Sequence, residues 1–294
     1  MTVITLKSDL LTVQIEDVGA QLSSVRNNAG TEYIWEGSPA SWNRHAPLLF
    51  PVISRLKDNR YTLNGKTYTI PQHGFARNLP FTIVEHDDAR AVFTLTENAD
   101  TLSVFPFPFL LTVTYELEGD QLKKTIQVKN TGSEKMFFEV GIHDGFSAPH
   151  DPAKSMDDWA VVLPGVETIH PYGLDESAMI TPRIDPITFE RGRIPLRPMK
   201  YGLDTFVLDT PETHTACLVD ENDKPVVTMD FPGFPYLGIW TVHRDFETRY
   251  VCIEPWSTLP DATFVGRGLD EKAGIRSLQP GLTDTLSYTT TFHC

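Results

Sequence analysis

The sequence predicts an all-β protein, built as one large antiparallel β-sandwich with few short helices. Three observations support this prediction. Apolar and polar residues alternate with a period of two in many segments, 22 prolines and 19 glycines interrupt the 294 residues, and no 15-residue amphipathic stretch has helical spacing. Because so many strands cannot remain in one open sheet, we expect them to split into packed layers within a single domain, residues 1–294.

Two hairpins are the clearest local prediction. Residues 113–117 alternate apolar and polar side chains, and the alternation resumes over residues 122–128 after a Gly-Asp turn. This pattern is typical of a hairpin with one exposed face. An Asn-Gly dipeptide, which suits a tight primed turn, joins a second predicted pair at 61–63 and 68–70.

Other strands and the few helices follow from shorter signals. Further strands are predicted at 89–97, 224–231, 236–242, 249–256 and 284–292. Short helices are predicted at 38–45, 98–107 and 268–274. The second of these is cut short by two prolines, which the interior of a helix does not accept. The proline-rich residues 149–198 predict long ordered loops with short strands.

Composition and charge exclude several classes of partner. The formal net charge is −14, which repels phosphate backbones and anionic membranes, so we expect no nucleic-acid partner and no membrane binding. No apolar run approaches the roughly 20 residues of a membrane helix, and the N-terminus lacks the pattern of a signal peptide. The three cysteines have no CxxC spacing and fit a reducing compartment, so we expect a cytoplasmic protein.

Common catalytic motifs are missing. The sequence contains no G-x-S-x-G, G-x-G-x-x-G, P-loop or H-E-x-x-H pattern, which removes the usual support for serine hydrolases, dinucleotide or nucleotide enzymes and zinc proteases. Polar groups at the ends of strands remain as the places to look for a site.

His143 is one such group. It lies at the end of the apolar run in FEVGIHDGFSAP, residues 138–149. A histidine there can be a metal ligand, a proton-transfer group, or a core-edge residue bonded to the backbone. A second His-Asp pair follows seven residues later, but a strand followed by a loop does not fix both pairs on one face. With no thiolate nearby in the sequence, we expect no metal site.

A second polar group surrounds the predicted hairpin at 61–70. Arg55 follows the apolar segment PLLFPVIS, and His73 and Arg77 follow the hairpin in QHGFAR. Gly74 lets a ligand or another strand come close to the backbone. These residues are either a surface arginine and a half-buried histidine, or part of a site built where a strand ends.

Glu254 is a candidate general base. It shares one face of a predicted strand with Cys252 and lies between an apolar run and Pro-Trp. Loss of water there should raise the pKa of the carboxyl group toward the range useful for a base, although a structural ion pair is an equal alternative. Trp240 and Trp256 are either core residues or a stacking platform for a sugar. Asp204 precedes another apolar run and is equally compatible with a turn.

Taken in order, these stretches resemble the aldose 1-epimerase (galactose mutarotase-like) family, and within it the bacterial LacX-type branch. The resemblance covers nearly the whole chain, through GAQLSSVRNNAGTEYIW, FPVISRLKDNRYTLNGKTY, PQHGFARN, FEVGIHDGF, LDTFVLD, FPYLGIW, VCIEPW and KAGIRSLQPG. It implies a β-supersandwich fold. One position departs from the LacX-type pattern, Gly-His-Pro-Ala-Phe, because Asp144 replaces the proline beside the histidine.

The resemblance also implies a role for individual residues. His143 matches the family's general acid and Glu254 its general base. Arg55 and His73 match residues that contact the sugar, and Asp204 matches the aspartate that binds sugar hydroxyl groups. Three further residues are predicted to bind substrate: Arg77, Trp240 and Trp256.

Anomer interconversion is chemistry that such a pair can perform. The C1 hydroxyl must lose a proton while the ring oxygen gains one, so a protonated imidazole and a carboxylate acting together lower the barrier. We expect these groups to face each other across one pocket, about 5–8 Å apart. No metal or other cofactor is required. The expected partner is a small sugar, and the protein is expected to be a monomer or a homodimer.

Three alternatives stay open. HGFAR also resembles hexose-6-phosphate epimerases, in which Arg77 would contact the phosphate. A non-catalytic sugar-binding protein can use the same sandwich, because fold does not fix function. The third alternative is a purely structural β-protein.

Overall fold

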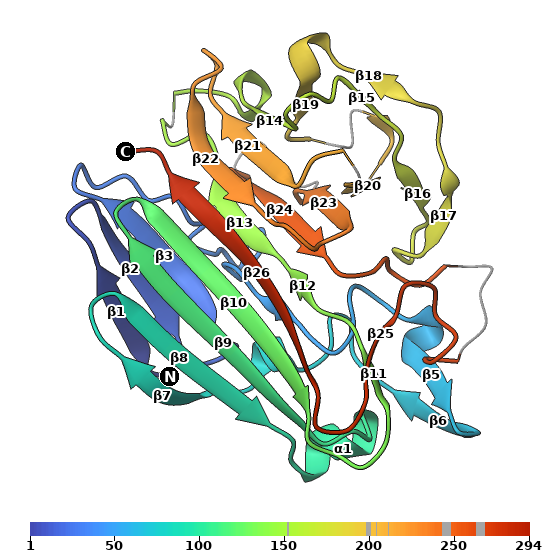
Figure 1. The fold of residues 1–294 in the computed structure, drawn as a ribbon. Coiled ribbons are helices and arrows are strands. Elements are labelled where there is room, and N and C mark those ends of the chain that lie inside the picture. The colour runs from blue at the N-terminus through green and yellow to red at the C-terminus, as the bar shows by residue number, and fades with distance from the viewer. Residues whose placement is uncertain (152, 198–200, 204, 211, 243–247, 263–267) are drawn as a thin grey trace.

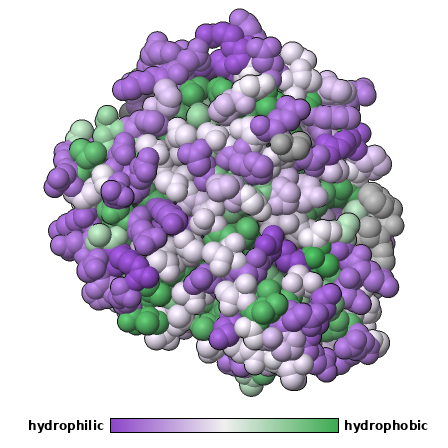
Figure 2. Space-filling model, viewed as in Figure 1, coloured by the Kyte–Doolittle hydropathy of each residue, from purple (hydrophilic) through white to green (hydrophobic). Residues whose placement is uncertain are grey.

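The computed structural model describes residues 1–294 except 152, 198–200, 204, 211, 243–247 and 263–267. Two large antiparallel sheets dominate the described residues, and smaller sheets and hairpins lie around them (Figure 1). This is the sandwich that the sequence predicts. Figure 2 shows that hydrophilic side chains cover most of one face of the molecule, while hydrophobic side chains lie there in small patches.

The first large sheet has nine strands in the described part of the chain. In spatial order they are β19 (Arg193–Pro195), β14 (Ala160–Val162), β21 (Thr215–Val219), β22 (Pro225–Asp230), β26 (Thr283–Phe292), β10 (Gln121–Asn130), β9 (Phe109–Glu118), β8 (Arg90–Thr96) and β7 (Thr82–His86). Side chains along β10 alternate between buried and exposed, because one face packs in the core and the other meets water.

The second large sheet carries the candidate site. Its order is β17 (Ile180–Arg183), β16 (Tyr172–Leu174), β20 (Thr205–Asp209), β23 (Tyr236–Trp240), β24 (Tyr250–Trp256), β12 (Gly141–Ile142) and β4 (Leu48–Leu49), and β13 (Asp144–Ser147) also pairs with β24. Every residue of β24 is buried. Strand β24 is therefore covered on both faces, by the core on one and by the site on the other.

Smaller elements complete the fold. One is a three-stranded sheet of β1 (Val3–Lys7), β2 (Leu11–Glu16) and β3 (Gln21–Asn27). Three are strand pairs: β5 (Arg60–Leu63) with β6 (Lys66–Thr69), β11 (Met136–Phe138) with β25 (Arg276–Leu278), and β15 (Thr168–Ile169) with β18 (Ile187–Thr188). The helical elements are α1 (Ala99–Val104) and 3-10 turns at Lys57–Asn59, Ala76–Asn78, Met156–Asp158 and Glu190–Gly192. No helix among the described residues is long and apolar enough to cross a membrane.

Most local predictions are confirmed. Both predicted hairpins form, as β9–β10 and β5–β6, and Asn64 and Gly65 both have the positive φ that a primed turn requires. Helix α1 begins after Asn98, whose side chain accepts a hydrogen bond from the Thr101 N–H, and it ends before the prolines.

Two predicted helices are wrong. Residues 38–45 contain no helix, and residues 268–274 form a series of turns. In the first segment the carbonyl oxygen of Trp42 accepts hydrogen bonds from the Trp35 indole N–H and the Ser38 N–H, both at 2.8 Å. These bonds satisfy the backbone outside a helix and hold Trp42 in an irregular loop.

Gly74 fixes the position of the polar segment after the β5–β6 hairpin. It has a φ of +70°, and a Cβ atom there would lie 2.2 Å from the Phe50 carbonyl oxygen. The N–H of Phe75 donates a hydrogen bond to this same oxygen at 3.1 Å. The close backbone approach that the sequence allows at this glycine is therefore made by the segment that contains β4.

We expect Gly74→Ala to lower the free energy of unfolding by at least about 2 kcal/mol, because it adds both left-handed strain and a backbone clash. Gly65→Ala is the matched control, since Gly65 also has a positive φ, +75°, but a Cβ atom added there would meet no other atom within 4 Å. It should cost only about 1 kcal/mol. Urea unfolding of both variants measures the difference, and equal losses would contradict this explanation of Gly74.

Candidate active site

The register of β13 on β24 brings the two predicted proton-transfer residues together. Asp144 pairs with Ile253 and Gly145 with Cys252, so His143 stands opposite Glu254. Because side chains alternate across a strand, His143, Cys252 and Glu254 lie on the same face of the sheet. His143 Nε2 is 3.4 Å from Glu254 Oε2.

This separation is shorter than the predicted 5–8 Å. The two residues face each other as expected, but they are cross-strand neighbours and are in direct contact. The predicted range assumed a sugar between them. Both side chains are almost fully buried, with 9% of the His143 side chain and 2% of the Glu254 side chain exposed.

Aromatic rings enclose the imidazole of His143. Trp42 stacks on it with ring centroids 5.0 Å apart and an interplanar angle of 26°. The rings of Trp240 and His73 meet it edge to face, at centroid distances of 5.5 and 5.4 Å. The rings fix the plane of His143 and exclude water from it.

Sequence reasoning missed Trp42, which it assigned to a helix. A Cβ at Gly145 would lie 2.7 Å from the Trp42 ring, so this small residue on β13 makes room for the indole. Trp42 also stacks on Tyr250 at 5.4 Å. The only signal in the sequence was an aromatic residue next to basic ones in SWNRH.

His73 presents a defined tautomer to the site. Its Nδ1 accepts a hydrogen bond from the Ser54 N–H at 3.1 Å, so the proton of the neutral ring is on Nε2. Burial, followed by the positive charges around it, lowers the pKa of His73 well below its ordinary value. His73 therefore acts at neutral pH as a hydrogen-bond donor without charge.

His143 is also neutral at pH 7. Burial, and then the charges of Arg77 and Arg44, lower its pKa to about 3. The carboxylate of Glu254 at 3.4 Å opposes this shift, because a negative charge favours the imidazolium. The expectation of an imidazolium at pH 7 is therefore not met in this structure.

Two arginines lie close enough for their charge to act on His143. Arg77 donates from Nη2 to the carbonyl oxygen of Gln72 at 2.8 Å, and Arg44 donates from Nη2 to the Asn78 side chain at 2.8 Å. Burial, and then the charge of Arg44, lower the pKa of Arg77 to about 10. In the described part of the chain neither arginine has a carboxylate within ion-pair distance.

The other predicted substrate-binding residues occupy different positions. Arg55 is exposed at the edge of the site, and its charge contributes to lowering the pKa of His73. Trp240 is half-buried beside His143, whereas Trp256 is 4% exposed and belongs to a small apolar cluster. Asp204 lies outside the described residues.

Asp144, which replaces the proline of the LacX-type pattern, points to the opposite face of the sheet. The Tyr288 hydroxyl donates a hydrogen bond to its Oδ2 at 2.5 Å, and the charge of buried Lys124 partly offsets the rise that burial causes in the pKa of Asp144. Tyr288 and Lys124 belong to the nine-stranded sheet. The residue next to His143 therefore ties β13 to the opposite layer.

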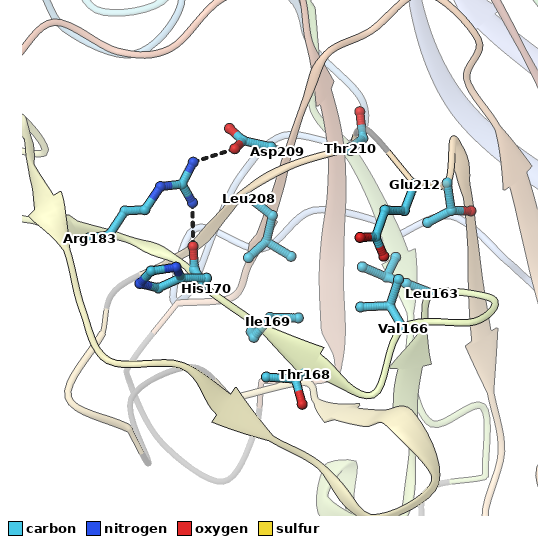
Figure 3. A pocket seen from close by; sticks show the side chains of 11 residues that line it. Leu163, Val166, Thr168, Ile169, His170, Arg183, Leu208, Asp209, Thr210 and Glu212 are labelled. Carbon is cyan, nitrogen blue, oxygen red and sulfur yellow. Dashed lines mark hydrogen bonds and ion pairs between the residues drawn. The ribbon is translucent and has the colours of Figure 1, made fainter.

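A separate pocket lies away from these residues, with a volume of about 170 Å³ (Figure 3). Its floor is apolar, and its rim carries Arg183, which is bonded to Asp209 and to the carbonyl oxygen of His170. None of the predicted site residues lines it, so we assign it no part in the chemistry.

The fold and this site define the class of protein. The family model for aldose 1-epimerase matches residues 2–273, and the chain belongs to that family. Among curated relatives, the chromosomal protein LacX of Lactococcus lactis subsp. lactis is 28% identical over 293 residues, which cover 97% of each chain.

Two solved structures are close in fold. A galactose mutarotase related enzyme from Lactobacillus acidophilus superposes with a TM-score of 0.90 and 30% identity, over 100% of this chain and 98% of the other. A galactose mutarotase-like protein from Lactobacillus casei gives the same TM-score and identity over 99% and 100%.

The buried histidine makes stability sensitive to acid. The unfolded chain binds a proton at His143 below about pH 6.5, whereas the folded protein does not until about pH 3, so stability falls as pH drops through this window. At pH 5, His143 should lower the free energy of unfolding by about 2 kcal/mol relative to pH 7. His143→Gln should remove this part of the decrease in the free energy of unfolding between pH 7 and pH 5.

His86→Gln is the matched control, because it makes the same substitution at a histidine that is exposed on β7. Urea unfolding at several pH values measures both slopes. If the His143 variant kept the slope of the unaltered protein, the imidazole would not be held neutral by the fold.

Proposed function

We propose that this protein interconverts the α and β anomers of a hexose by acid–base ring opening and closure. The observation that carries the proposal is the direct contact of His143 and Glu254, 3.4 Å apart under a cover of aromatic rings. A hemiacetal needs an acid and a base at neighbouring oxygens, and this pair offers one of each. The proposal includes a cytoplasmic location, in keeping with the three free cysteines.

The proton steps follow from the chemistry of the ring. Glu254 takes the proton of the C1 hydroxyl while His143 gives a proton to the ring oxygen, and the bond between C1 and the ring oxygen breaks. The open aldehyde rotates about C1–C2. Closure reverses both transfers, so the pair returns to its starting state after each cycle and carries a single proton throughout.

His143 must therefore be protonated in the sugar complex. Two features favour its imidazolium there, the Glu254 carboxylate and the face of Trp42 stacked against the ring. The positive charges of Arg77 and Arg44 oppose it. His73, with its proton on Nε2, and half-buried Trp240 are placed to hold a hydroxyl group and cover an apolar face of the sugar.

We expect Glu254→Gln and His143→Asn each to lower turnover at least about 100-fold, because each removes one proton-transfer group and keeps a similar shape. Polarimetry of freshly dissolved α-glucose and α-galactose measures the rate. Glu85→Gln and His86→Asn on exposed β7 are the matched controls and should keep full activity.

Normal turnover in either site variant would remove its assigned role. Retained sugar binding together with no mutarotation in the unaltered protein would favour the alternative of a non-catalytic sugar-binding protein.

A second candidate is an epimerase for an anionic sugar such as a hexose 6-phosphate. The observation that favours it is the pair Arg44 and Arg77, which have no carboxylate partner in the described residues and lie close enough to lower the pKa of His143. A bound phosphate would neutralise these charges, and the imidazolium of His143 would become easier to form.

We therefore expect Arg77→Gln to distinguish the two substrates. If the natural substrate is phosphorylated, kcat/KM for glucose 6-phosphate should exceed that for glucose, and the variant should lose about tenfold or more on the phosphorylated sugar alone. Asn78→Ala, which removes only the hydrogen-bond partner of Arg44, is the control for local packing. Equal kcat/KM values for glucose and glucose 6-phosphate would reject a phosphorylated sugar as the natural substrate.

A further inference from the structure

We propose that His143, Cys252 and Glu254 form a site for a thiophilic divalent cation such as Zn²⁺, and that this cation competes with the sugar. The three side chains are buried on one face of the sheet, His143 from the residue between β12 and β13 and the other two from β24, with which both strands pair. Inhibition by the cation rests on the proposed function, whereas binding of the cation does not.

The spacing of the three donors is close to that of a zinc site. One ligand atom from each residue lies within 4.8 Å of the others, and the imidazole and carboxylate atoms are 3.4 Å apart. Ligand atoms around a tetrahedral zinc ion are roughly 3.3–3.7 Å apart. The nitrogen and oxygen donors already have this spacing, and because the three ligand atoms lie within 4.8 Å of one another, the Cys252 sulfur needs to approach by no more than about 1 Å.

The chemistry of the donors selects the metal. Thiolate and imidazole favour Zn²⁺ and Co²⁺ over Mg²⁺ and Ca²⁺. The thiolate of Cys252 and the carboxylate of Glu254 together balance two positive charges, and binding releases the thiol proton to solvent. No metal site is expected from the sequence because the thiol comes from a distant segment, which the strand register brings alongside His143.

A cation bound in this way would stop the reaction. Both groups that move protons would become metal ligands, so neither the acid nor the base would reach the sugar. Cys252 takes no part in the proton steps. It can therefore be removed to separate metal binding from catalysis, since the two remaining residues suffice for the reaction.

Cobalt provides a readout that does not depend on activity. Titration of the whole protein with Co²⁺ should give a thiolate-to-cobalt charge-transfer band that EDTA abolishes. Zn²⁺ should displace Co²⁺ and inhibit mutarotation reversibly, with inhibition relieved by high sugar concentration. Mg²⁺ should do neither.

Two cysteine variants test the assignment. Cys252→Ala should lose the band, bind Co²⁺ at least about 100-fold more weakly, and keep mutarotase activity that Zn²⁺ no longer inhibits. Cys252→Ser, which keeps the side-chain volume, serves if the alanine variant is poorly folded. The double variant Cys217→Ala/Cys294→Ala removes the half-buried and exposed thiols and should retain both the band and the inhibition.

The outcomes separate the two proposals. Absence of the cobalt band, or its persistence in Cys252→Ala, would overturn the metal site. A band that depends on Cys252, together with mutarotation that Zn²⁺ leaves unchanged, would overturn the competition between the cation and the sugar. A cobalt band that depends on Cys252, in a protein without mutarotation on any hexose, would support the metal site and reject the proposed function.

Discussion

The antiparallel register between β13 and β24 is the constraint on which the site depends. It sets His143 opposite Glu254, and a slip of one residue would turn every side chain of β13 to the other face. His143 would then enter the core, and Asp144 would face the site. The bond from Tyr288 to Asp144, and the charge of Lys124 near it, hold the register from the opposite sheet. The position that departs from the LacX-type pattern thus has a structural role behind the site.

Burial strengthens electrostatic interactions in this site and also disfavours the charged form of His143. Rings from Trp42, Trp240 and His73 enclose the imidazole of His143. The low local dielectric strengthens the electrostatic interactions of any charge that forms there. The same burial keeps His143 neutral at pH 7. In the proposed reaction, protonation of His143 therefore depends on the substrate, and the nearby Arg77 makes the charge of that substrate important. The same strand pairing places the Cys252 thiol, the third proposed metal ligand, close to His143 and Glu254.

Period-two patterns predicted most of the strands and the common face of Cys252 and Glu254, because alternation is a local property of the chain. The contact of Glu254 with His143 needed the register between distant strands, which no local pattern contains. The family resemblance predicts that His143 and Glu254 act together as acid and base, but it does not predict the distance between their side chains. Trp42 was missed because its segment has helix-compatible residues, while tertiary hydrogen bonds from Trp35 and Ser38 hold it in a loop. Such bonds override propensity and are invisible in the sequence.

The most direct test of the central claim is a crystal structure of the Glu254→Gln variant with a bound hexose. We predict that the contact between residues 143 and 254 opens to admit the sugar. The ring oxygen should then lie within hydrogen-bond distance of His143 Nε2 and the C1 hydroxyl within hydrogen-bond distance of the side chain at 254. A hexose bound elsewhere, or bound with its anomeric carbon away from both side chains, would contradict the assignment of this pair as acid and base.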